Sequence, residues 1–241
     1  EVTKTIREAG VMNAIITSNP DKADFEAVKN YVIKDAVKSV STSKAELYPS
    51  EEHKHNVVLM DFGAKQNIIR ELNSRGCNVA AMPYDTKAED ILKLGVDGIM
   101  LSNGPGDPAE NVGIVEEIKK LIGKVPIFGI CLGHQLLALA MGGETTKLKY
   151  GHRGVNQPVK NLETGRTYIS SQNHGYAVVN ESIEKIGGKI SYINANDNTC
   201  EGVEYPGKKA FSVQFHPEAC SGPKDTEFIF DKFIDMMEGK E

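Results

Sequence analysis

The sequence lacks a hydrophobic run long enough to cross a membrane. Its most apolar stretch, residues 125–141, is interrupted by two glycines, a histidine and a glutamine, and it falls short of the roughly 20 residues that a bilayer requires. The first residues contain no apolar core of the kind found in signal peptides. We therefore expect a protein that does not span a membrane and that works in the cytoplasm.

Basic patches and cysteine clusters are also missing. The formal net charge of -5 arises from interspersed acids and bases, so no basic stripe offers a footprint for nucleic acid or anionic lipid. The cysteines are few and widely spaced: Cys77, Cys131, Cys200 and Cys220. In a chain of this length, such spacing favours reduced thiols over a disulfide framework, and one of them could be reactive.

The first fifty residues differ in pattern from the rest. We expect a helix over residues 1–9, a strand over 11–17 and a helix starting near Pro20, followed by a helix with an apolar face from Phe25 to Val37. The polar stretch 39–55 is typical of a linker. This is too little for a complete domain, so we interpret residues 1–50 as the end of a longer chain's first domain, and 56–241 as the main domain.

From Asn56 onward, short apolar strands alternate with amphipathic helices, which is typical of a βαβ sheet. Strands are predicted over 57–61, 77–82, 98–101 and 127–130, and helices over 65–75, 87–94, 113–122 and 132–141. After Gly143 we expect no helix before 225–237, and antiparallel strands over 167–171, 189–194, 199–204 and 210–215. The predicted fold class is α/β, a mostly parallel central sheet flanked by helices with an antiparallel C-terminal extension.

One cysteine lies where a buried strand should end and a helix begin. The run Gly129-Ile130-Cys131-Leu132-Gly133 has the form of a nucleophile elbow with cysteine in place of serine. Its flanking glycines allow a sharp turn that exposes the sulfur. At a helix N-terminus, unpaired N–H groups and the helix dipole favour the thiolate over the thiol. The alternative is a small buried thiol, so a base elsewhere in the chain is needed to decide.

A candidate base follows a predicted apolar strand in the run Phe215-His216-Pro217-Glu218. Residues i and i+2 of an extended chain point the same way, so Glu218 can hydrogen-bond one nitrogen of His216 while the other faces a thiol. Pro217 is poorly suited to a strand interior, which places His216 at the strand end. By itself, the run would equally describe a strand terminus with a solvated acid.

A glycine-rich loop, Ser102-Asn103-Gly104-Pro105-Gly106-Asp107-Pro108, follows another predicted strand. At the carboxyl end of a strand in the same sheet, such a loop can offer main-chain N–H groups to an oxyanion. No phosphate-binding loop or dinucleotide fingerprint occurs in the sequence, so nucleotide binding is not supported.

In this order, the Gly-Pro-Gly loop, the Gly-Ile-Cys-Leu-Gly-His-Gln elbow and the His-Pro-Glu run resemble the class I (triad) glutamine amidotransferases, which have a flavodoxin-like fold. The resemblance covers about residues 57–237. Four further runs look like those of the small subunits of carbamoyl-phosphate synthetases: Asp61 to Lys65, Asn103 to Pro108, Gly151 to Asn156 and Gln172 to Gly175. Residues 1–50 would then be the remnant of that subunit's N-terminal domain.

The resemblance implies roles for individual residues. Cys131 would be the nucleophile, His216 the general acid and base, and Glu218 its orienting partner. Leu132 and Gly104 would supply the oxyanion N–H groups. The residues that would hold glutamine are Gln135, Gly106, Asn173, Gly175 and Tyr176, whereas His174 and Gln172 are interpreted as structural.

The resemblance also implies an activity and a partner. Glutamine would be hydrolysed to glutamate and ammonia through a thioester on Cys131. The ammonia would pass to the large subunit of a carbamoyl-phosphate synthetase, for arginine and pyrimidine biosynthesis. No cofactor is expected in this chain, since ATP, magnesium and bicarbonate would bind only to the large subunit.

Three alternatives stay open on the residues alone. A non-catalytic module of the same fold would be expected to have lost one of Cys131, His216 or Glu218. A hydrolase or peptidase of related fold would share the elbow and differ in its substrate. Metal binding by Cys131-x-x-His134 or His53-x-His55 is not favoured, because the first starts a helix and the second lies in a charged linker; we predict no metal site.

Overall fold

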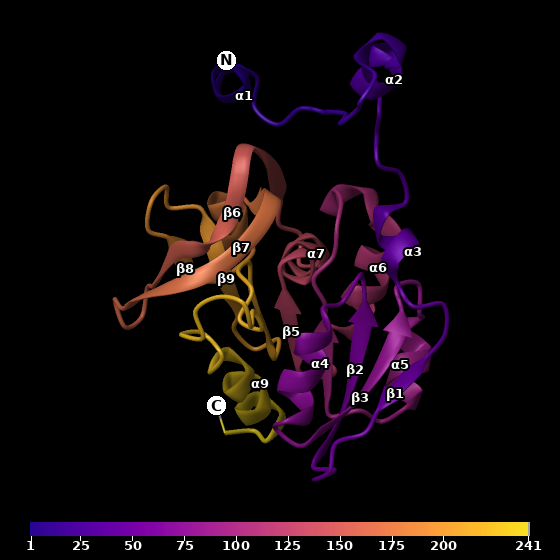
Figure 1. The fold of residues 1–241 in the computed structure, drawn as a ribbon. Coiled ribbons are helices and arrows are strands. Elements are labelled where there is room, and N and C mark those ends of the chain that lie inside the picture. Colours follow the sequence, from indigo (N-terminus) through magenta and orange to yellow (C-terminus); the bar gives the residue numbers. More distant parts are fainter. Residues whose placement is uncertain (241) are drawn as a thin grey trace.

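A computed structural model describes residues 1–240 of the chain. Its strands form a single ten-stranded sheet in the order β1-β3-β2-β4-β5-β10-β9-β8-β6-β7. The five central strands, β3 to β10 in this order, pair in parallel, and the strands beyond them on both sides pair antiparallel. The predicted α/β class with an antiparallel C-terminal extension is therefore confirmed (Figure 1).

The parallel part is made of short βα units. Its strands and the antiparallel edge strand are β1 (Glu46–Tyr48), β2 (His55–Asp61), β3 (Cys77–Pro83), β4 (Gly98–Leu101), β5 (Ile127–Ile130) and β10 (Ala210–Val213). The connecting helices are α4 (Gln66–Asn73), α5 (Ala88–Lys93), η2 (Pro108–Glu110), α6 (Val112–Leu121) and α7 (Leu132–Ala140). All of these except β1 and η2 were predicted, with ends that differ by at most two residues.

The extension and the closing helix complete the sheet and its layers. They are β6 (Thr145–Asn161), β7 (Thr167–Val178), α8 (Asn180–Lys185), β8 (Lys189–Asn194), β9 (Cys200–Tyr205) and α9 (Ile229–Met237). In Figure 1, β6 to β9 gather beside the upper end of the parallel sheet, with α7 between the two parts.

Two apolar cores cover the two faces of the sheet. Along β2, side chains alternate between them: Val58 and Met60 join the core under α5, α6 and α7, whereas Val57 and Leu59 join the core under α4 and α9. This alternation follows from the two-residue period of a strand. Because both faces are covered, the central strands are continuous apolar runs, which is the pattern that made them predictable.

The N-terminal segment departs from the prediction. It contains α1 (Val2–Ala9), η1 (Pro20–Lys22), α2 (Phe25–Lys29) and α3 (Ala36–Val40). The predicted strand over 11–17 is wrong, because these residues are exposed and pair with no other strand. The predicted helix from Phe25 to Val37 is divided, because residues 30–35 leave the helical path and Asp35 has a positive φ of 49°.

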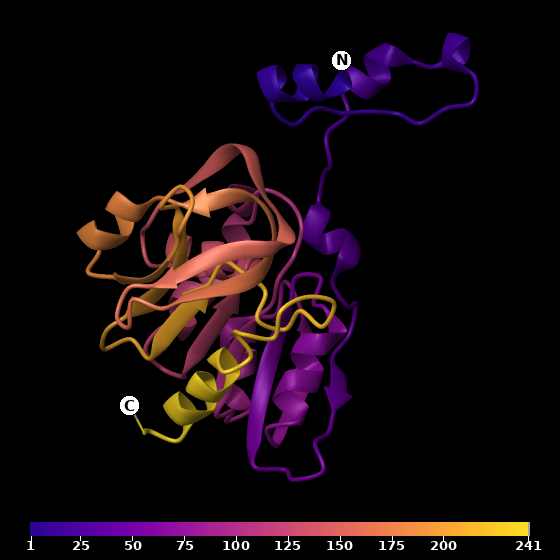
Figure 2. The same cartoon turned by 60° about the vertical axis from the view of Figure 1, so that its left-hand side comes forward.

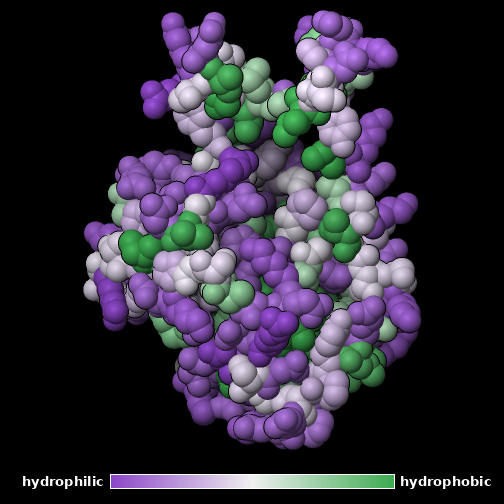
Figure 3. Space-filling model, in the orientation of Figure 1, coloured by the Kyte–Doolittle hydropathy of each residue, from purple (hydrophilic) through white to green (hydrophobic). Residues whose placement is uncertain are grey.

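Figure 2 shows α1 and α2 standing apart from the body, joined to α3 by an extended stretch. In Figure 3, apolar side chains are visible on this projecting part. The large exposed apolar side chains of the first 35 residues are Val2, Ile6, Val11, Met12, Ile15, Ile16, Phe25, Tyr31, Val32 and Ile33.

Three further predictions are corrected. The stretch 39–55 is not only a linker, because β1 within it pairs with β3. The predicted absence of helices after Gly143 is wrong, since α8 interrupts the strands. The strand predicted over 167–171 extends to Val178, where it pairs with β6, a strand that was not predicted because its 17 residues are mostly polar and exposed.

Among residues 1–240, none of the helices combines the length and the apolar character that a membrane crossing requires.

Candidate active site

Cys131 joins the end of β5 to the start of α7 in a strained conformation. Its φ of 52° and ψ of -102° lie outside the regions that a side chain normally allows, and such backbone costs about 1–3 kcal/mol. Its N–H donates to the carbonyl of Val213 on β10 at 2.9 Å, and its carbonyl accepts from the N–H of Gln135 at 3.2 Å. The structure therefore has the predicted elbow, with Cys131 as the residue that caps α7.

Close packing explains both glycines of the elbow. A Cβ on Gly129 would lie 2.7 Å from the carbonyl oxygen of Gly133, and a Cβ on Gly133 would lie 2.2 Å from the carbonyl oxygen of Leu101. No side chain fits at either position. The glycines thus let β4, β5 and the first turn of α7 approach one another, which sets the position of the thiol.

His216 and Glu218 lie beside Cys131 because β10 pairs in parallel with β5. Ser212 is opposite Gly129 and Val213 is opposite Ile130, so the chain leaves both strands at the same edge of the sheet. His216 Nδ1 donates to Glu218 Oε1 at 2.7 Å, and Cys131 lies close enough to the ring to raise the pKa of His216. The three residues predicted to form a triad are thus brought together in that order.

The electrostatics of this group favour an ion pair. Burial opposes a charge on His216, but the charges and hydrogen bonds of Cys131 and Glu218 outweigh it and raise the pKa of His216 to about 10. Burial likewise opposes a charge on Glu218, but His216 and Lys65 together hold the pKa of its carboxyl below the usual value. The favoured state of this pair is therefore an imidazolium next to a carboxylate.

Lys65 is a member of this group that the sequence did not single out as a site residue. Its Nζ lies 3.6 Å from Glu218 Oε1 and 3.3 Å from His216 Nδ1, and its side chain is half-exposed. Asn67, on α4, donates from its side-chain amide to the carbonyl of Glu218. Lys65 ends the run Asp61 to Lys65, one of the runs that carry the family resemblance, but only the fold places that run against Glu218.

The predicted oxyanion donors lie next to each other. Leu132 is the first residue of α7, where N–H groups have no partner within the helix. A Cβ on Gly104 would lie 2.7 Å from the Leu132 side chain and 2.3 Å from the carbonyl of Phe62. Gly104 therefore brings the loop backbone against the start of α7, as an oxyanion hole formed by these two residues requires.

A cleft of about 440 Å³ opens beside Cys131, a size suited to a small ligand. Six of the seven residues predicted to contact substrate line it, and Leu132 is the exception: the lining members are Gly104, Gly106, Gln135, Asn173, Gly175 and Tyr176. The cleft wall also includes residues that were not predicted to contact substrate: Val11, Asn13, Tyr31, Val32, Ile33, Asp107, Lys147, Arg153 and His174.

Gln135 and Tyr176 are tied together inside this wall. Gln135 Nε2 donates to the Tyr176 carbonyl and to Gln214 Oε1, both at 2.8 Å. Both amide hydrogens are therefore used within the protein, and only the amide oxygen is left for a ligand. Burial and a hydrogen bond with Asp107 raise the pKa of Tyr176 to about 12, so that its hydroxyl stays neutral.

The two metal motifs considered from the sequence do not assemble. His134 turns away from Cys131 into the core, where its Nδ1 contacts Ser212 Oγ at 2.8 Å; burial lowers its pKa to about 3. His53 contacts Asn78, whereas His55 pairs with Glu238.

Known proteins resemble this chain over most of its length. The family model for class-I glutamine amidotransferases matches residues 58–236. A carbamoyl phosphate synthase small chain of Staphylococcus saprophyticus is 49% identical over 239 residues, which cover 98% of this chain and 65% of the relative. One of Bacillus cereus is 50% identical over 240 residues, which cover 99% and 65%. The chain therefore spans 65% of the length of these relatives.

A solved structure agrees on the fold. A protein of Thermoplasma acidophilum described as a putative GMP synthase subunit superimposes with a TM-score of 0.66 and 22% sequence identity, covering 78% of this chain and 96% of that one. At this identity the likeness concerns the fold alone. The family model matches well over half of the chain, so this chain belongs to the class-I glutamine amidotransferases.

Proposed function

We propose that this chain hydrolyses glutamine to glutamate and ammonia, with Cys131 as the nucleophile. The observation that carries the proposal is the chain of contacts from Cys131 through His216 to Glu218, at the edge of a cleft lined by the predicted substrate residues. A thiol paired with a buried imidazolium and carboxylate is the arrangement of an activated nucleophile.

In the proposed reaction, the Cys131 thiolate attacks the side-chain amide carbon of glutamine. The N–H groups of Leu132 and Gly104 stabilise the oxyanion, and His216 gives a proton to the departing ammonia. His216 then takes a proton from water, which attacks the thioester and releases glutamate. No metal or cofactor takes part in these steps.

We further propose that the ammonia serves the large subunit of a carbamoyl phosphate synthase, in the cytoplasm, for arginine and pyrimidine biosynthesis. Support comes from the relatives, which are small chains of that enzyme and about half identical in sequence over nearly all of this chain. ATP, magnesium and bicarbonate would then bind to the large subunit. The interpretation of residues 1–50 as part of a preceding domain stays a prediction.

A glutamine analogue with an electrophilic side chain tests the nucleophile. We expect one adduct per chain, located on Cys131 by intact mass and peptide mapping, and no adduct in Cys131→Ser. Cys220→Ser is the matched control, because Cys220 is an exposed thiol outside the cleft. Its adduct should form at the wild-type rate. Labelling at another cysteine, or unchanged ammonia release by Cys131→Ser, would contradict the assignment.

Ammonia release from glutamine tests the reaction and the partner. It should be measured with and without the large subunit of a carbamoyl phosphate synthase, and we expect release to increase when that subunit is present. Hydrolysis of peptides or esters, with no release from glutamine in either condition, would instead favour a hydrolase of the same fold.

A further inference from the structure

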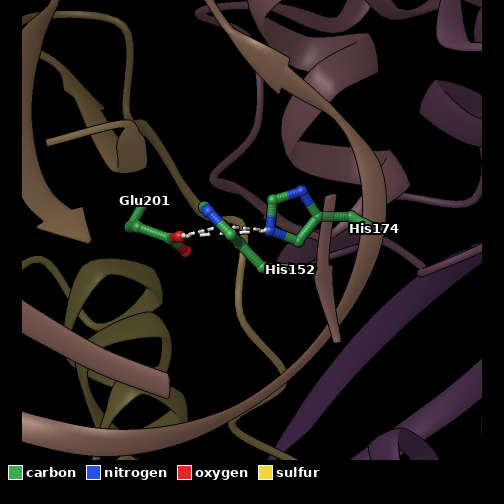
Figure 4. A group of neighbouring side chains, drawn as sticks. All are labelled: His152, His174 and Glu201. Atoms are coloured by element: carbon green, nitrogen blue, oxygen red, sulfur yellow. Dashed lines mark hydrogen bonds and ion pairs between the residues drawn. The ribbon is translucent and has the colours of Figure 1, made fainter. Parts of the chain in front are cut away.

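A second group of ionisable side chains lies behind the wall of the cleft. It joins His152 on β6, His174 on β7 and Glu201 on β9 (Figure 4). His152 Nδ1 lies 3.2 Å from His174 Nε2 and 3.3 Å from Glu201 Oε1, and His174 Nε2 lies 3.9 Å from that oxygen. The three side chains are almost entirely removed from solvent, with 13%, 2% and 0% of their surfaces exposed.

Hydrogen bonds on the outer side of each ring decide which nitrogens face the group. His152 Nε2 donates to Asp197 Oδ2 at 2.8 Å, and His174 Nδ1 donates to the Tyr176 carbonyl at 2.7 Å. When both rings are neutral, each carries one N–H, so the opposite nitrogens, His152 Nδ1 and His174 Nε2, present lone pairs to each other. Glu201 and Asp197 raise the pKa of His152, so a proton competes for the same position.

Oxygen acceptors lie around these two lone pairs, together with one donor: the amide nitrogen of Asn194 is 3.5 Å from His152 Nδ1. Besides Glu201 Oε1, the amide oxygen of Gln172 lies 3.0 Å from His174 Nε2, while the amide nitrogen of Gln172 donates to Ser170. Asn194 donates to Glu201 Oε1 at 3.3 Å. Glu201 Oε2 is buried and has no hydrogen-bond partner in the described part of the chain. These buried acceptors outnumber the donors that face them, which favours a positive charge within the group.

A proton can satisfy only some of these acceptors. A proton on His152 Nδ1 can be donated to Glu201 Oε1 or to His174 Nε2, but not to both. The atom that does not receive it keeps a lone pair directed at another acceptor. A metal ion can accept a lone pair from His152 Nδ1, His174 Nε2 and Glu201 Oε1 at the same time. In a tetrahedral zinc site with bonds of about 2.0–2.2 Å, neighbouring ligand atoms are separated by about 3.3–3.6 Å, which is close to the spacing seen here.

The outer hydrogen bonds also match a metal site. Histidine ligands of metals almost always donate their second N–H to a carboxylate or a backbone carbonyl, which fixes the tautomer and the ring. Here Asp197 does this for His152, and the Tyr176 carbonyl does it for His174. We propose that His152, His174 and Glu201 form a binding site for one zinc-class divalent metal ion, separate from Cys131, His216 and Glu218.

The ligand types limit the choice of ion. Two imidazole nitrogens and one carboxylate suit zinc and its neighbours, whereas magnesium and calcium prefer oxygen ligands throughout. The bound ion ties three strands of the antiparallel extension together. Because His174 stands between Asn173 and Gly175, it also holds the cleft wall in place.

Metal titration of the Cys131→Ser variant tests the site, because this background removes the competing thiol next to His216. After treatment with a chelator, zinc is added in a calorimeter, and cobalt(II) is added while visible absorption is recorded. We expect one ion per chain, absorption bands of a four-coordinate cobalt site and a higher Tm with zinc. A lack of saturable binding by protein with a native circular dichroism spectrum would overturn the proposal.

Variants assign the binding to these residues, all made in the Cys131→Ser background. His152→Asn and Glu201→Gln should each lower zinc affinity by more than 100-fold, and Asp197→Asn by about 10- to 100-fold. Asp197 is half-exposed, so we expect Asp197→Asn to fold. Its zinc affinity can therefore be measured even if Glu201→Gln fails to fold. His53→Asn is the control, because His53 lies outside the group. The zinc affinity of this variant should equal that of its parent. Equal affinity in His152→Asn, Asp197→Asn and their parent would overturn the proposal.

Discussion

At the scale of single residues, the site depends on charges held away from water. Cys131, His216 and Glu218 are all buried, so each charge is stabilised mainly by its neighbour rather than by solvent. The sequence predicted this group because each motif follows a strand of one parallel sheet, and the carboxyl ends of such strands meet at one edge. It offered no reason to place Lys65 against Glu218, because that contact depends on how α4 packs.

Glu218→Gln should remove the charge that supports His216. We expect glutamine hydrolysis to slow by about 10²- to 10⁴-fold, the range for loss of an acid–base group or its orienting carboxylate. The measurement is kcat for ammonia release across pH, with Glu116→Gln, an exposed acid on α6, as the control. A loss smaller than threefold would contradict the role proposed for Glu218.

The same substitution should change the pH dependence of stability. The pKa of His216 is about 10 in the folded chain and about 6.5 when unfolded. The contribution of His216 to the free energy of unfolding is therefore complete below pH about 6.5 and is lost as pH rises towards 10. The free energy of unfolding then falls by up to about 1.4 kcal/mol per pH unit. In Glu218→Gln the pKa of His216 is lower, so the loss should end at lower pH.

Urea unfolding of both proteins between pH 6.5 and 9.5 measures this difference. Burial raises the pKa of Cys77 and of Cys200 to about 12, so these thiols also lower stability at high pH, but equally in both proteins. Identical slopes in the two proteins would show that Glu218 does not support the charge on His216.

At the scale of helices and strands, the elbow depends on backbone contact. The glycines of the elbow were predicted from the sequence as a turn, but the structure adds that Gly133 faces the Leu101 carbonyl. Some strands could be predicted from the sequence and others could not, because they differ in how far their two faces are buried. Strands covered on both faces are apolar and distinct, whereas β6 is polar and exposed, so only its pairing with β7 and β8 defines it.

Gly133→Ala should destabilise the fold strongly, because the new Cβ would lie 2.2 Å from a backbone oxygen that cannot move aside. We expect a loss of at least about 1–3 kcal/mol in the free energy of unfolding. Gly113→Ala on α6 is the matched control, since nothing lies within 4 Å of the added Cβ, and it should stabilise by about 0.5–1 kcal/mol. Equal stability of the two variants in urea unfolding would contradict the packing argument.

At the scale of the whole molecule, one wall of the cleft comes from the N-terminal segment. Asn13, Tyr31 and Ile33 line the cleft, yet no large apolar side chain among the first 35 residues is buried. The sequence could not predict this wall, because the predicted elements of the segment do not indicate which surface of the body they face. His152, His174 and Glu201 were likewise isolated in polar stretches, and only the register of β6 to β9 brings them together.

Removing residues 1–34 should therefore weaken glutamine binding and leave the stability of the fold nearly unchanged. We expect the free energy of unfolding to change by less than about 1 kcal/mol, while KM for glutamine rises. Removing residues 1–53 should lower the free energy of unfolding by a further amount of about 2–4 kcal/mol. The reason is that α3 buries Val37, β1 pairs with the edge of β3, and the Thr42 N–H donates to Asp61. Urea unfolding and ammonia release measure both effects, and equal stability of the two truncations would contradict the division.

The pairing of β5 with β10 has a consequence for the order of events during synthesis. The ribosome delivers Cys131 long before His216, and the whole antiparallel extension is made between them. Contacts between segments so distant in the chain form late in folding. The proposed nucleophile therefore emerges without its proposed base. We expect the reactivity of Cys131 to appear only when the fold is nearly complete.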